Sequence, residues 1–346
     1  MNLLKVTTYN SDIDSISQKF NFYDEFKNKS LFITGCNGLI CSAVVDLLIF
    51  INEERNLNLK IYLASRNVQK TIERFSVNEK KFLIPFEYDA NKEFCVSEKI
   101  DYFIHGASNA TPEFFGKFPV ETLNANVFGI EQILKNSMKN KSRVLYISSS
   151  EIYGKLENQT EPIKENQYGF VDILNPRSCY AIGKRASETL CASYRAEYKI
   201  DFVIARPGHI YGPTASRNDN RVSSQFMYNA VDKKNIVMKS KGEQIRSYTH
   251  CLDCASAILT ILVKGQNGEA YNISNLHSIC SIKEMAENFA KYGNIKLDFD
   301  LPTESEKKNF NPMLNSSLNS EKLESLGWHP QFDIKTGIQR TLECLK

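Results

Sequence analysis

Short runs of apolar residues recur between positions 31 and 205 of this 346-residue chain. Stretches in which apolar residues return every three or four positions separate most of these runs, which is the spacing of an amphipathic helix. The strand-like runs are 31–34, 61–64, 82–86, 102–105, 144–148 and 202–205. Strands that alternate with helices predict βαβ units, whose right-handed crossovers build a parallel sheet covered on both faces. We therefore expect an α/β fold with a doubly wound parallel sheet.

The first run leads directly into a glycine-rich turn and then into a helix. Gly35 follows the run at 31–34, and the apolar residues after the turn share one face of a 3.6-residue period. These residues are Ile40, Val44, Leu47, Leu48 and Ile51. The order predicted here is strand, turn, helix.

The pattern changes after Arg206, where prolines and glycines interrupt the regular alternation. We expect residues 1–28 to form an N-terminal helical extension and residues 29–206 to form the first domain. A strand-like alternation at 270–274 predicts that part of 247–275 returns to complete the first sheet. Residues 207–346 are predicted to form mainly a second, smaller α/β lobe.

Composition narrows the class of protein. Hydrophobic residues make up 42% of the chain and the formal charge is +3, so the basic surface of a nucleic-acid binder is not expected. The longest purely apolar stretch, Leu47–Ile51, is far too short for a membrane span. No export signal is visible at the N-terminus, and we expect a cytoplasmic protein that binds neither nucleic acid nor membrane.

Nine cysteines are scattered along the chain, and we expect reduced thiols rather than disulfides. Cys251 and Cys254 form a C-x-x-C pair, which suggests half a zinc site or a redox pair. A second C-x-x-C pair and a close pair of histidines are both missing. We therefore favour small residues at the start of a helix, and predict no metal site.

The glycine-rich turn is the first candidate binding site. Gly35 permits a tight turn, Gly38 permits close approach of a pyrophosphate, and the following helix offers amide donors from its first residues. The predicted cofactor contacts along this segment are Gly35, Asn37, Gly38, Leu39 and Ile40. The last glycine of the usual dinucleotide fingerprint is Cys41 here, a small residue that we expect to be tolerated. The alternative is a tight turn that binds nothing.

The end of the second predicted strand is expected to meet the adenosine ribose. An acidic residue there favours NAD, but this chain has Ser65 and Arg66. An arginine can hold a 2′-phosphate, so we favour NADP(H) over NAD, with a solvated surface arginine as the alternative. Asp89, after the third run, is a candidate contact for the adenine amino group, or else a loop-capping residue.

Two segments supply candidate chemistry. Tyr180 and Lys184 lie four residues apart on one helical face, where the ammonium is expected to lower the pKa of the phenol so that it accepts a proton. Ser149, after the strand-like run at 144–148, offers a hydroxyl that orients a substrate oxygen. Ligands of open α/β sheets bind at the carboxyl ends of strands, where this serine is placed.

Together these elements resemble the extended short-chain dehydrogenase/reductase superfamily, and within it the NAD(P)-dependent nucleotide-sugar epimerases, dehydratases and decarboxylases. The resemblance covers about residues 29–340 and extends to further motifs in the same order. These are His105-Gly106-Ala107-Ser108, Asn126-Val127-Phe128-Gly129, Arg206-Pro207, Tyr211-Gly212-Pro213, Arg221, Arg246 and Leu326-Gly327-Trp328. It implies a Rossmann-type cofactor domain and a C-terminal substrate-binding lobe.

The resemblance also assigns roles. It implies that Tyr180 is the general base, that Lys184 holds the nicotinamide ribose, and that Ser149 bonds the reacting hydroxyl. Ala107, Ser108, Asn126 and Pro207 are implied cofactor contacts, and Arg221 and Arg246 are implied contacts of the substrate diphosphate. His209 stands where an asparagine is usual and is expected either to meet substrate or to fill the hinge. A homodimer is implied as well.

Within the family, the runs Ser149-Ser150-Glu151 and Arg177-Ser178-Cys179-Tyr180 are most similar to the branch of UDP-glucuronate decarboxylases and dTDP-glucose 4,6-dehydratases. Two departures separate the chain from both. The dehydratases have an aspartate at the position of Ser150, and the decarboxylases have an arginine in the segment that corresponds to 312–317, which contains none here. Glu151 remains a candidate for proton handling beside a 4-ketone, or a cap of its turn.

We therefore expect a cytoplasmic enzyme that oxidises a nucleoside-diphosphate sugar at C4 and then modifies or re-reduces the ketone. The resemblance places such a reaction in the synthesis of surface-polysaccharide precursors. One alternative is net redox chemistry at C4 with a dissociable cofactor, and another is UDP-glucuronate decarboxylation. An alternative of a different class is an NAD(P)-sensing binding protein without chemistry.

Overall fold

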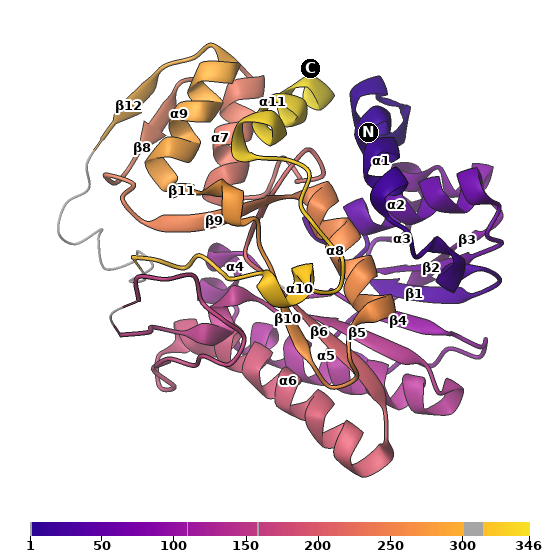
Figure 1. The fold of residues 1–346 in the computed structure, drawn as a ribbon. Helices are drawn as coiled ribbons and strands as arrows, with labels where there is room; N and C mark the ends of the chain where they lie inside the picture. Colours follow the sequence, from indigo (N-terminus) through magenta and orange to yellow (C-terminus); the bar gives the residue numbers. More distant parts are fainter. Residues whose placement is uncertain (1, 109, 158, 301–313) are drawn as a thin grey trace.

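The computed structural model describes residues 2–108, 110–157, 159–300 and 314–346. Its centre is a seven-stranded sheet, parallel throughout, with the strand order β10-β6-β5-β4-β1-β2-β3 (Figure 1). The strands are β1 (Ser30–Thr34), β2 (Lys60–Ser65), β3 (Leu83–Glu87), β4 (Tyr102–His105), β5 (Arg143–Ile147), β6 (Asp201–Pro207) and β10 (Ala270–Ile273). The predicted doubly wound parallel sheet is confirmed, and each of the six predicted runs is one of its strands.

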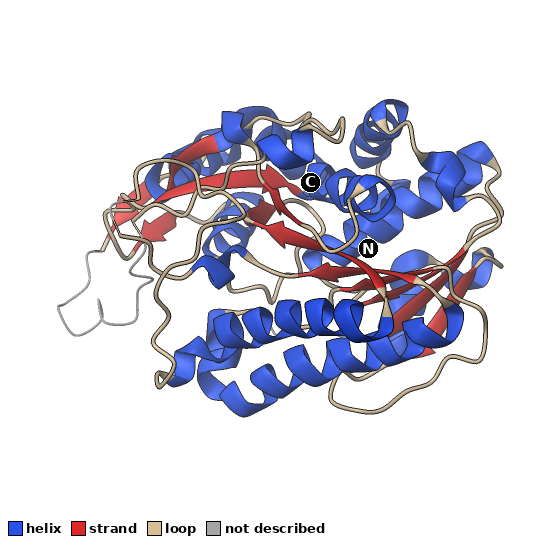
Figure 2. Cartoon of the chain, turned by 60° about the horizontal axis from the view of Figure 1, so that its bottom comes forward, coloured by secondary structure: helices blue, strands red, loops and turns tan. Residues whose placement is uncertain are grey.

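Alternate residues of each central strand enter two separate hydrophobic cores. In β5, Leu145 and Ile147 point into one core, whereas Val144 and Tyr146 point into the other. All four are buried, which explains why the run reads as continuously apolar. The sheet is therefore the middle of three layers, with helices above and below it (Figure 2).

Five helices cover this sheet. They are α2 (Leu39–Arg55), α3 (Val68–Phe75), α5 (Pro119–Asn140), α6 (Cys179–Tyr198) and α8 (Cys251–Lys264). Helices α5 and α6 pack together on one face, and α2 packs with α8 on the other (Figure 1). The strand at 270–273, far along the chain, adds β10 to the edge beside β6.

Helix α2 differs from the expected amphipathic helix because it is buried on nearly all sides. Ala43, Val45 and Ile49 lie outside the predicted apolar face, yet none of them is exposed. The reason is a second covering layer: helix α1 (Thr7–Lys19) packs on α2, and the Tyr9 hydroxyl donates to the Asp46 carboxylate at 2.9 Å. The N-terminal segment thus closes a face of α2 that would otherwise meet solvent.

The second lobe stands over the carboxyl edge of the main sheet. Its strands are β7 (His209–Tyr211), β8 (Ile236–Met238), β9 (Ile245–His250), β11 (Ile279–Ser281) and β12 (Leu297–Phe299). They form a three-stranded sheet, β11-β9-β7, and a parallel pair, β12-β8. The remaining helices are α4 (Pro112–Lys117), α7 (Val222–Val231), α9 (Ile282–Gly293), α10 (Glu321–Glu324) and α11 (Ile334–Leu345).

The described part of the chain has neither a membrane-spanning helix nor a cluster of potential metal ligands. No helix there has both the length and the apolar character needed to cross a bilayer. Cys251 and Cys254 lie in the first turn of α8, both fully buried, and no cluster of three or more potential metal ligands occurs among the described residues. The pair therefore packs as small residues at a helix start.

Candidate active site

The glycine-rich turn joins β1 to α2 at the carboxyl edge of the main sheet. Gly35 has a φ of +71°, and a Cβ there would lie 2.9 Å from the backbone of Gly106 and Ala107. Gly38 caps the start of α2 and donates its N–H to the Gly35 carbonyl at 2.8 Å. Only glycine combines this backbone angle with so close an approach of a neighbouring loop, so position 35 admits no side chain.

Cys41, which replaces the last glycine of the fingerprint, is accommodated by a second glycine. Its sulfur packs against Gly106 in the space that a Cβ at position 106 would occupy. The same loop is fixed by Thr34, whose hydroxyl oxygen accepts the N–H groups of Gly106 and Ala107 at 3.1 Å each. The departure at Cys41 thus preserves the close contact between α2 and the β4 loop.

The side chains after Gly35 also lie at the turn. Asn37 donates to the Thr71 hydroxyl at 2.8 Å, while its own Oδ1 is buried without a hydrogen-bond partner in the described structure. Leu39 is buried, Ile40 is half-buried, and the Leu39 carbonyl accepts the Thr214 hydroxyl at 2.8 Å. That bond ties the start of α2 to the second lobe.

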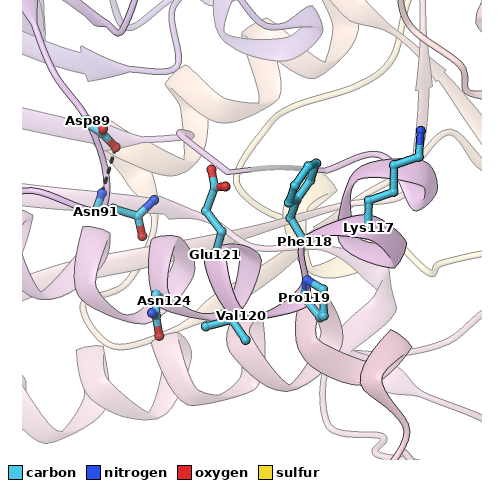
Figure 3. A pocket seen from close by; sticks show the side chains of 8 residues that line it. All are labelled: Asp89, Asn91, Lys117, Phe118, Pro119, Val120, Glu121 and Asn124. Carbon is cyan, nitrogen blue, oxygen red and sulfur yellow. Dashed lines mark hydrogen bonds between the residues drawn. The ribbon is translucent and has the colours of Figure 1, made fainter.

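A groove of about 670 Å³ lies between the loop after β3 and the start of α5 (Figure 3). It is lined by Asp89, Asn91, Lys117, Phe118, Pro119, Val120, Glu121 and Asn124. The Asp89 carboxylate accepts the N–H of Asn91 at 3.0 Å, so Asp89 also caps its own loop. The groove has the position expected for an adenine, at the carboxyl end of the third strand.

The two residues at the end of β2 differ in exposure. Ser65 is buried, and its hydroxyl is engaged with Thr71 at 2.7 Å. Arg66 has a side chain that is 62% exposed, and its guanidinium lies 3.7 Å from the carboxylate of Glu121, which lines the groove. Arg66 is thus free to turn toward a ligand in the groove, whereas Ser65 is already bonded.

Ser108, on the loop after β4, is hydrogen-bonded to Asn126 of α5. The Ser108 hydroxyl donates to Asn126 Oδ1 at 2.9 Å, and Asn126 Nδ2 donates to the Thr122 carbonyl at 2.8 Å. Ala107 is half-buried in the same loop, and Pro207 ends β6 opposite Ile273. Asn126 is itself buried, so its visible role is to hold Ser108 in place.

Ser149 and Tyr180 meet at the carboxyl end of β5. Ser149 precedes a 3-10 turn over Ser150–Tyr153, and Tyr180 lies in the first turn of α6. The Ser149 side chain lies close enough to the Tyr180 phenol to lower the pKa of that phenol, and the Ser149 hydroxyl accepts the Glu151 N–H at 3.2 Å. Ser150, at the position where the dehydratases have an acid, is buried at the start of the turn and carries no carboxyl group.

The predicted lowering of the Tyr180 pKa by Lys184 is wrong for the protein alone. The pKa of Tyr180 is raised to about 12. Burial is the main cause and the Glu151 charge adds to it, whereas Ser149 and the Arg221 charge act in the opposite direction. The Lys184 ammonium lies 5.8 Å from the centroid of the Tyr180 ring, but the hydrogen bond that it donates goes to the Ile147 carbonyl at 2.7 Å. Burial also lowers the pKa of Lys184 to about 7, which weakens the cation that the prediction relied on.

Phe115 and Arg177 complete this side of the site and were not predicted to belong to it. The Phe115 ring stacks on Tyr180, with centroids 5.3 Å apart and planes 18° from parallel. The Arg177 guanidinium lies over the Phe115 ring at 5.6 Å, and its Nη1 is 3.8 Å from Glu151 Oε2. Arg177 belongs to the run before Tyr180, but nothing in the sequence marks Phe115, which α4 brings in.

The second lobe supplies the opposite wall. His209 Nε2 bonds the Ser316 hydroxyl at 3.0 Å, and burial together with the charges of Arg246 and Arg221 lowers the pKa of His209 to about 3. The histidine is therefore neutral. Arg246 is buried in β9, and Arg221 is held by an ion pair with Asp219.

These residues face one another across the two lobes. The charge of Glu151 acts on both Tyr180 and Arg246, and the charge of Arg221 acts on Tyr180. Asn220, next to Arg221, donates to the Glu113 carboxylate on α4 at 2.7 Å, which links the lobes directly. Of the segment at 312–317, residues 312 and 313 lie outside the described residues, while Ser316 contacts His209. The arrangement can orient a hydroxyl, exchange its proton and surround an anion with guanidinium groups.

Comparison with known proteins identifies the family of the chain. The sequence model described as the NAD dependent epimerase/dehydratase family matches residues 31–274. The UDP-glucuronic acid decarboxylase 1 of Xenopus tropicalis is 26% identical over 340 residues, a match that covers 96% of this chain and 76% of the relative. The dTDP-D-glucose 4,6-dehydratase of Homo sapiens is 28% identical over 332 residues, covering 91% and 89% respectively.

The fold has solved counterparts as well. The dTDP-glucose 4,6-dehydratase DesIV of Streptomyces venezuelae, crystallised with NAD, superposes with a TM-score of 0.75 and 20% sequence identity. The match covers 91% of this chain and 96% of that protein. At this level of identity the superposition establishes the common fold.

Proposed function

This chain belongs to the NAD-dependent epimerase/dehydratase family, and we propose that it oxidises a nucleoside-diphosphate sugar at C4. The observation that carries the proposal is that Ser149, Tyr180 and Glu151 come together at the carboxyl end of β5. The ketone is then modified or reduced again within the same site, so the overall reaction is an epimerase- or dehydratase-type conversion.

The residues of the turn fit a dinucleotide. Gly35 leaves no room for a side chain, the first amides of α2 face the turn, and Asn37 Oδ1 is buried without a partner in the described structure. The groove at Asp89 fits an adenine. When bound, the nicotinamide supplies a hydride acceptor for the sugar carbon and a positive charge near the phenol.

The chain's own residues handle the proton. Tyr180 takes the C4 hydroxyl proton, and the Ser149 hydroxyl beside the phenol holds the same substrate oxygen. A pKa near 12 makes the buried phenol a poor base at neutral pH. The phenol would act as a base only with a positive charge near it, which an oxidised nicotinamide would supply. Phe115 covers one face of Tyr180 and excludes water from it.

Glu151 gives the site a second proton carrier. Oxidation at C4 acidifies the neighbouring carbons, and a carboxylate next to Tyr180 is placed to remove a proton from one of them. Arg177 pairs with Glu151 at 3.8 Å and holds it beside the phenol. The buried Arg246 and the Asp219-paired Arg221 lie across the site, where we propose that they bind the diphosphate.

A second candidate is decarboxylation of a nucleotide-linked hexuronate. It is favoured by the relatives named as UDP-glucuronic acid decarboxylases and by Arg177, a half-exposed guanidinium at the site. Arg177 would contact a substrate carboxylate in place of the arginine that the segment 312–317 does not contain. Release of carbon dioxide distinguishes this candidate.

The test is incubation of the purified protein with UDP-, dTDP-, GDP- and CDP-sugars and NAD in deuterated water. Products are read by mass spectrometry and NMR. Deuterium at C3 or C5 indicates proton exchange by Glu151, and loss of water or carbon dioxide appears as mass. Tyr180→Phe should abolish reduction of NAD by the sugar, whereas Tyr198→Phe, an exposed tyrosine on the same helix, should not. Turnover by Tyr180→Phe at the unaltered rate refutes the proposal.

We further propose a cytoplasmic homodimer. All nine cysteines are free, as expected for a reducing compartment. The paired helices α5 and α6 carry exposed apolar side chains, among them Met138 and Tyr198, which a second copy would cover. Light scattering after size-exclusion chromatography measures the oligomeric mass directly.

A further inference from the structure

The side chain of Arg185, the residue after Lys184, donates hydrogen bonds to main-chain carbonyl groups. Its Nε donates to the Ile152 carbonyl at 2.6 Å, and its Nη2 donates to the carbonyls of Tyr153 at 3.3 Å and Gly169 at 2.8 Å. Two of these acceptors end the 3-10 turn that begins directly after Ser149. The guanidinium therefore connects α6 to the turn that positions Ser149.

Two backbone hydrogen bonds at the ends of the turn are long, and the Ser149 hydroxyl accepts the Glu151 N–H at 3.2 Å. Ile152 N–H donates to the Ser149 carbonyl and Gly154 N–H donates to the Glu151 carbonyl, both at 3.3 Å. A single turn of this kind leaves its last carbonyl groups without partners inside the helix. Donors from outside the turn therefore help to fix its position. Arg185 donates to two of its carbonyls, and the Gly169 N–H donates to the Tyr153 carbonyl at 2.7 Å.

Tyr180 and Arg185 lie on the same helix, five residues apart, so α6 grips the turn at two places. Near the start of α6 the phenol lies beside Ser149, and one turn later the guanidinium donates hydrogen bonds to the far end of the same 3-10 turn. We propose that Arg185 is a positioning residue that holds Ser149 in register with Tyr180. This inference rests on the proposed function, because it concerns the same pair of hydroxyl groups.

A second arginine contacts the last side chain of the turn and holds the loop beyond it. Arg206 is buried, pairs with Glu188 at 2.6 Å, and donates to the Tyr153 hydroxyl at 3.0 Å and to the Glu165 carbonyl at 2.8 Å. The body of the loop is thus anchored independently of Arg185. Loss of Arg185 should displace the turn without unfolding the chain.

The test compares Arg185→Lys with Ser149→Ala and with the double variant. A lysine keeps the charge but lacks the planar fork that reaches several carbonyls together. We expect Arg185→Lys to lower the kcat of C4 oxidation about tenfold or more with little change in the KM of the nucleotide sugar. In the Ser149→Ala background the same substitution should cost little, because the residue through which Arg185 acts is already gone.

The pH profile gives a further readout. Ser149 lowers the pKa of Tyr180. If Ser149 is displaced in Arg185→Lys, the rise of kcat with pH should therefore move toward higher pH. Arg195→Lys, on the exposed part of the same helix, is the matched control and should leave the profile in place. Added guanidinium ion should restore part of the activity of Arg185→Ala but none of the activity of Ser149→Ala.

Three results overturn the inference. One is an unchanged kcat in Arg185→Lys, the second is an equal cost of that substitution with and without Ser149, and the third is global unfolding of both Arg185 variants. A wild-type protein that oxidises no nucleotide sugar contradicts the proposed function instead, so the two failures are distinguishable.

Discussion

The sulfur of Cys41 fills the space that a side chain at position 106 would need, so Cys41 and Gly106 fit as a pair. A cysteine at the place of the last fingerprint glycine is tolerated because the facing residue lacks a Cβ. The compensation lies 65 residues away in the sequence, on the loop after β4 (106 − 41 = 65).

This pairing predicts the result of a small substitution. Gly106→Ala should destabilise the protein by about 1–3 kcal/mol, because the new methyl group overlaps the sulfur. The same change in a Cys41→Gly background should cost clearly less. Urea unfolding of the four proteins of this cycle measures the coupling, and equal costs in the two backgrounds would show that the sulfur is not the obstacle.

Lys184 predicts a pH-dependent stability. Its pKa is lowered to about 7 in the folded protein, below the value near 10.4 of an unfolded lysine. Between these values the unfolded chain binds more protons, so this group makes the free energy of unfolding rise with pH, by about 1 kcal/mol per unit. Lys184→Met should remove that slope between pH 7 and 9 and stabilise the protein at pH 7, while abolishing activity. Urea titrations of both proteins across this pH range measure the slope. If Lys184→Met leaves the pH dependence of the free energy of unfolding unaltered, Lys184 does not have a lowered pKa in the folded protein.

Arg66 predicts the choice of cofactor. If its exposed guanidinium holds a 2′-phosphate, Arg66→Ala should raise the KM for NADP about tenfold and leave the KM for NAD unchanged. Lys70→Ala, an exposed cation on the adjacent helix, is the control. Equal effects on the two cofactors would remove the reason for favouring NADP(H), which the family description does not share.

A buried ion pair beneath the N-terminal helix should make a large contribution to the free energy of unfolding. Asp46 is fully buried in α2, accepts the Tyr9 hydroxyl and pairs with Arg74 of α3 at 2.5 Å. Asp46→Asn should cost about 3–5 kcal/mol because the guanidinium loses its carboxylate, and Tyr9→Phe should cost about 1–3 kcal/mol. Asp14→Asn, on the exposed side of α1, should cost little in the same unfolding measurement.

Much of the fold could be predicted because its signals are local. The apolar run at 102–105 is β4 residue for residue, and the strand expected at 270–274 is β10. The amphipathic pattern of α2 was incomplete, since no local signal shows that α1 covers its outer face. The cofactor turn was readable because Gly35 must adopt a positive φ whatever packs around it.

The chemistry of the site was less predictable from spacing. A spacing of four residues along a helix places Lys184 near Tyr180. It does not reveal that the Lys184 ammonium donates its hydrogen bond to the Ile147 carbonyl. Nor does it reveal that Phe115 stacks on the phenol, because α4 reaches Tyr180 across the fold. Burial then reverses the expected direction of the phenol pKa.

The order of strands, the glycine turn and the residue types available for proton transfer are written in the sequence, because hydrophobic period and backbone freedom act over a few neighbouring residues. The tertiary structure alone decides which of those groups meet, and how strongly each is desolvated. Arg185 illustrates the division: its place after Lys184 is visible in the chain, but its three carbonyl partners exist only once the Ser149 turn has packed against α6.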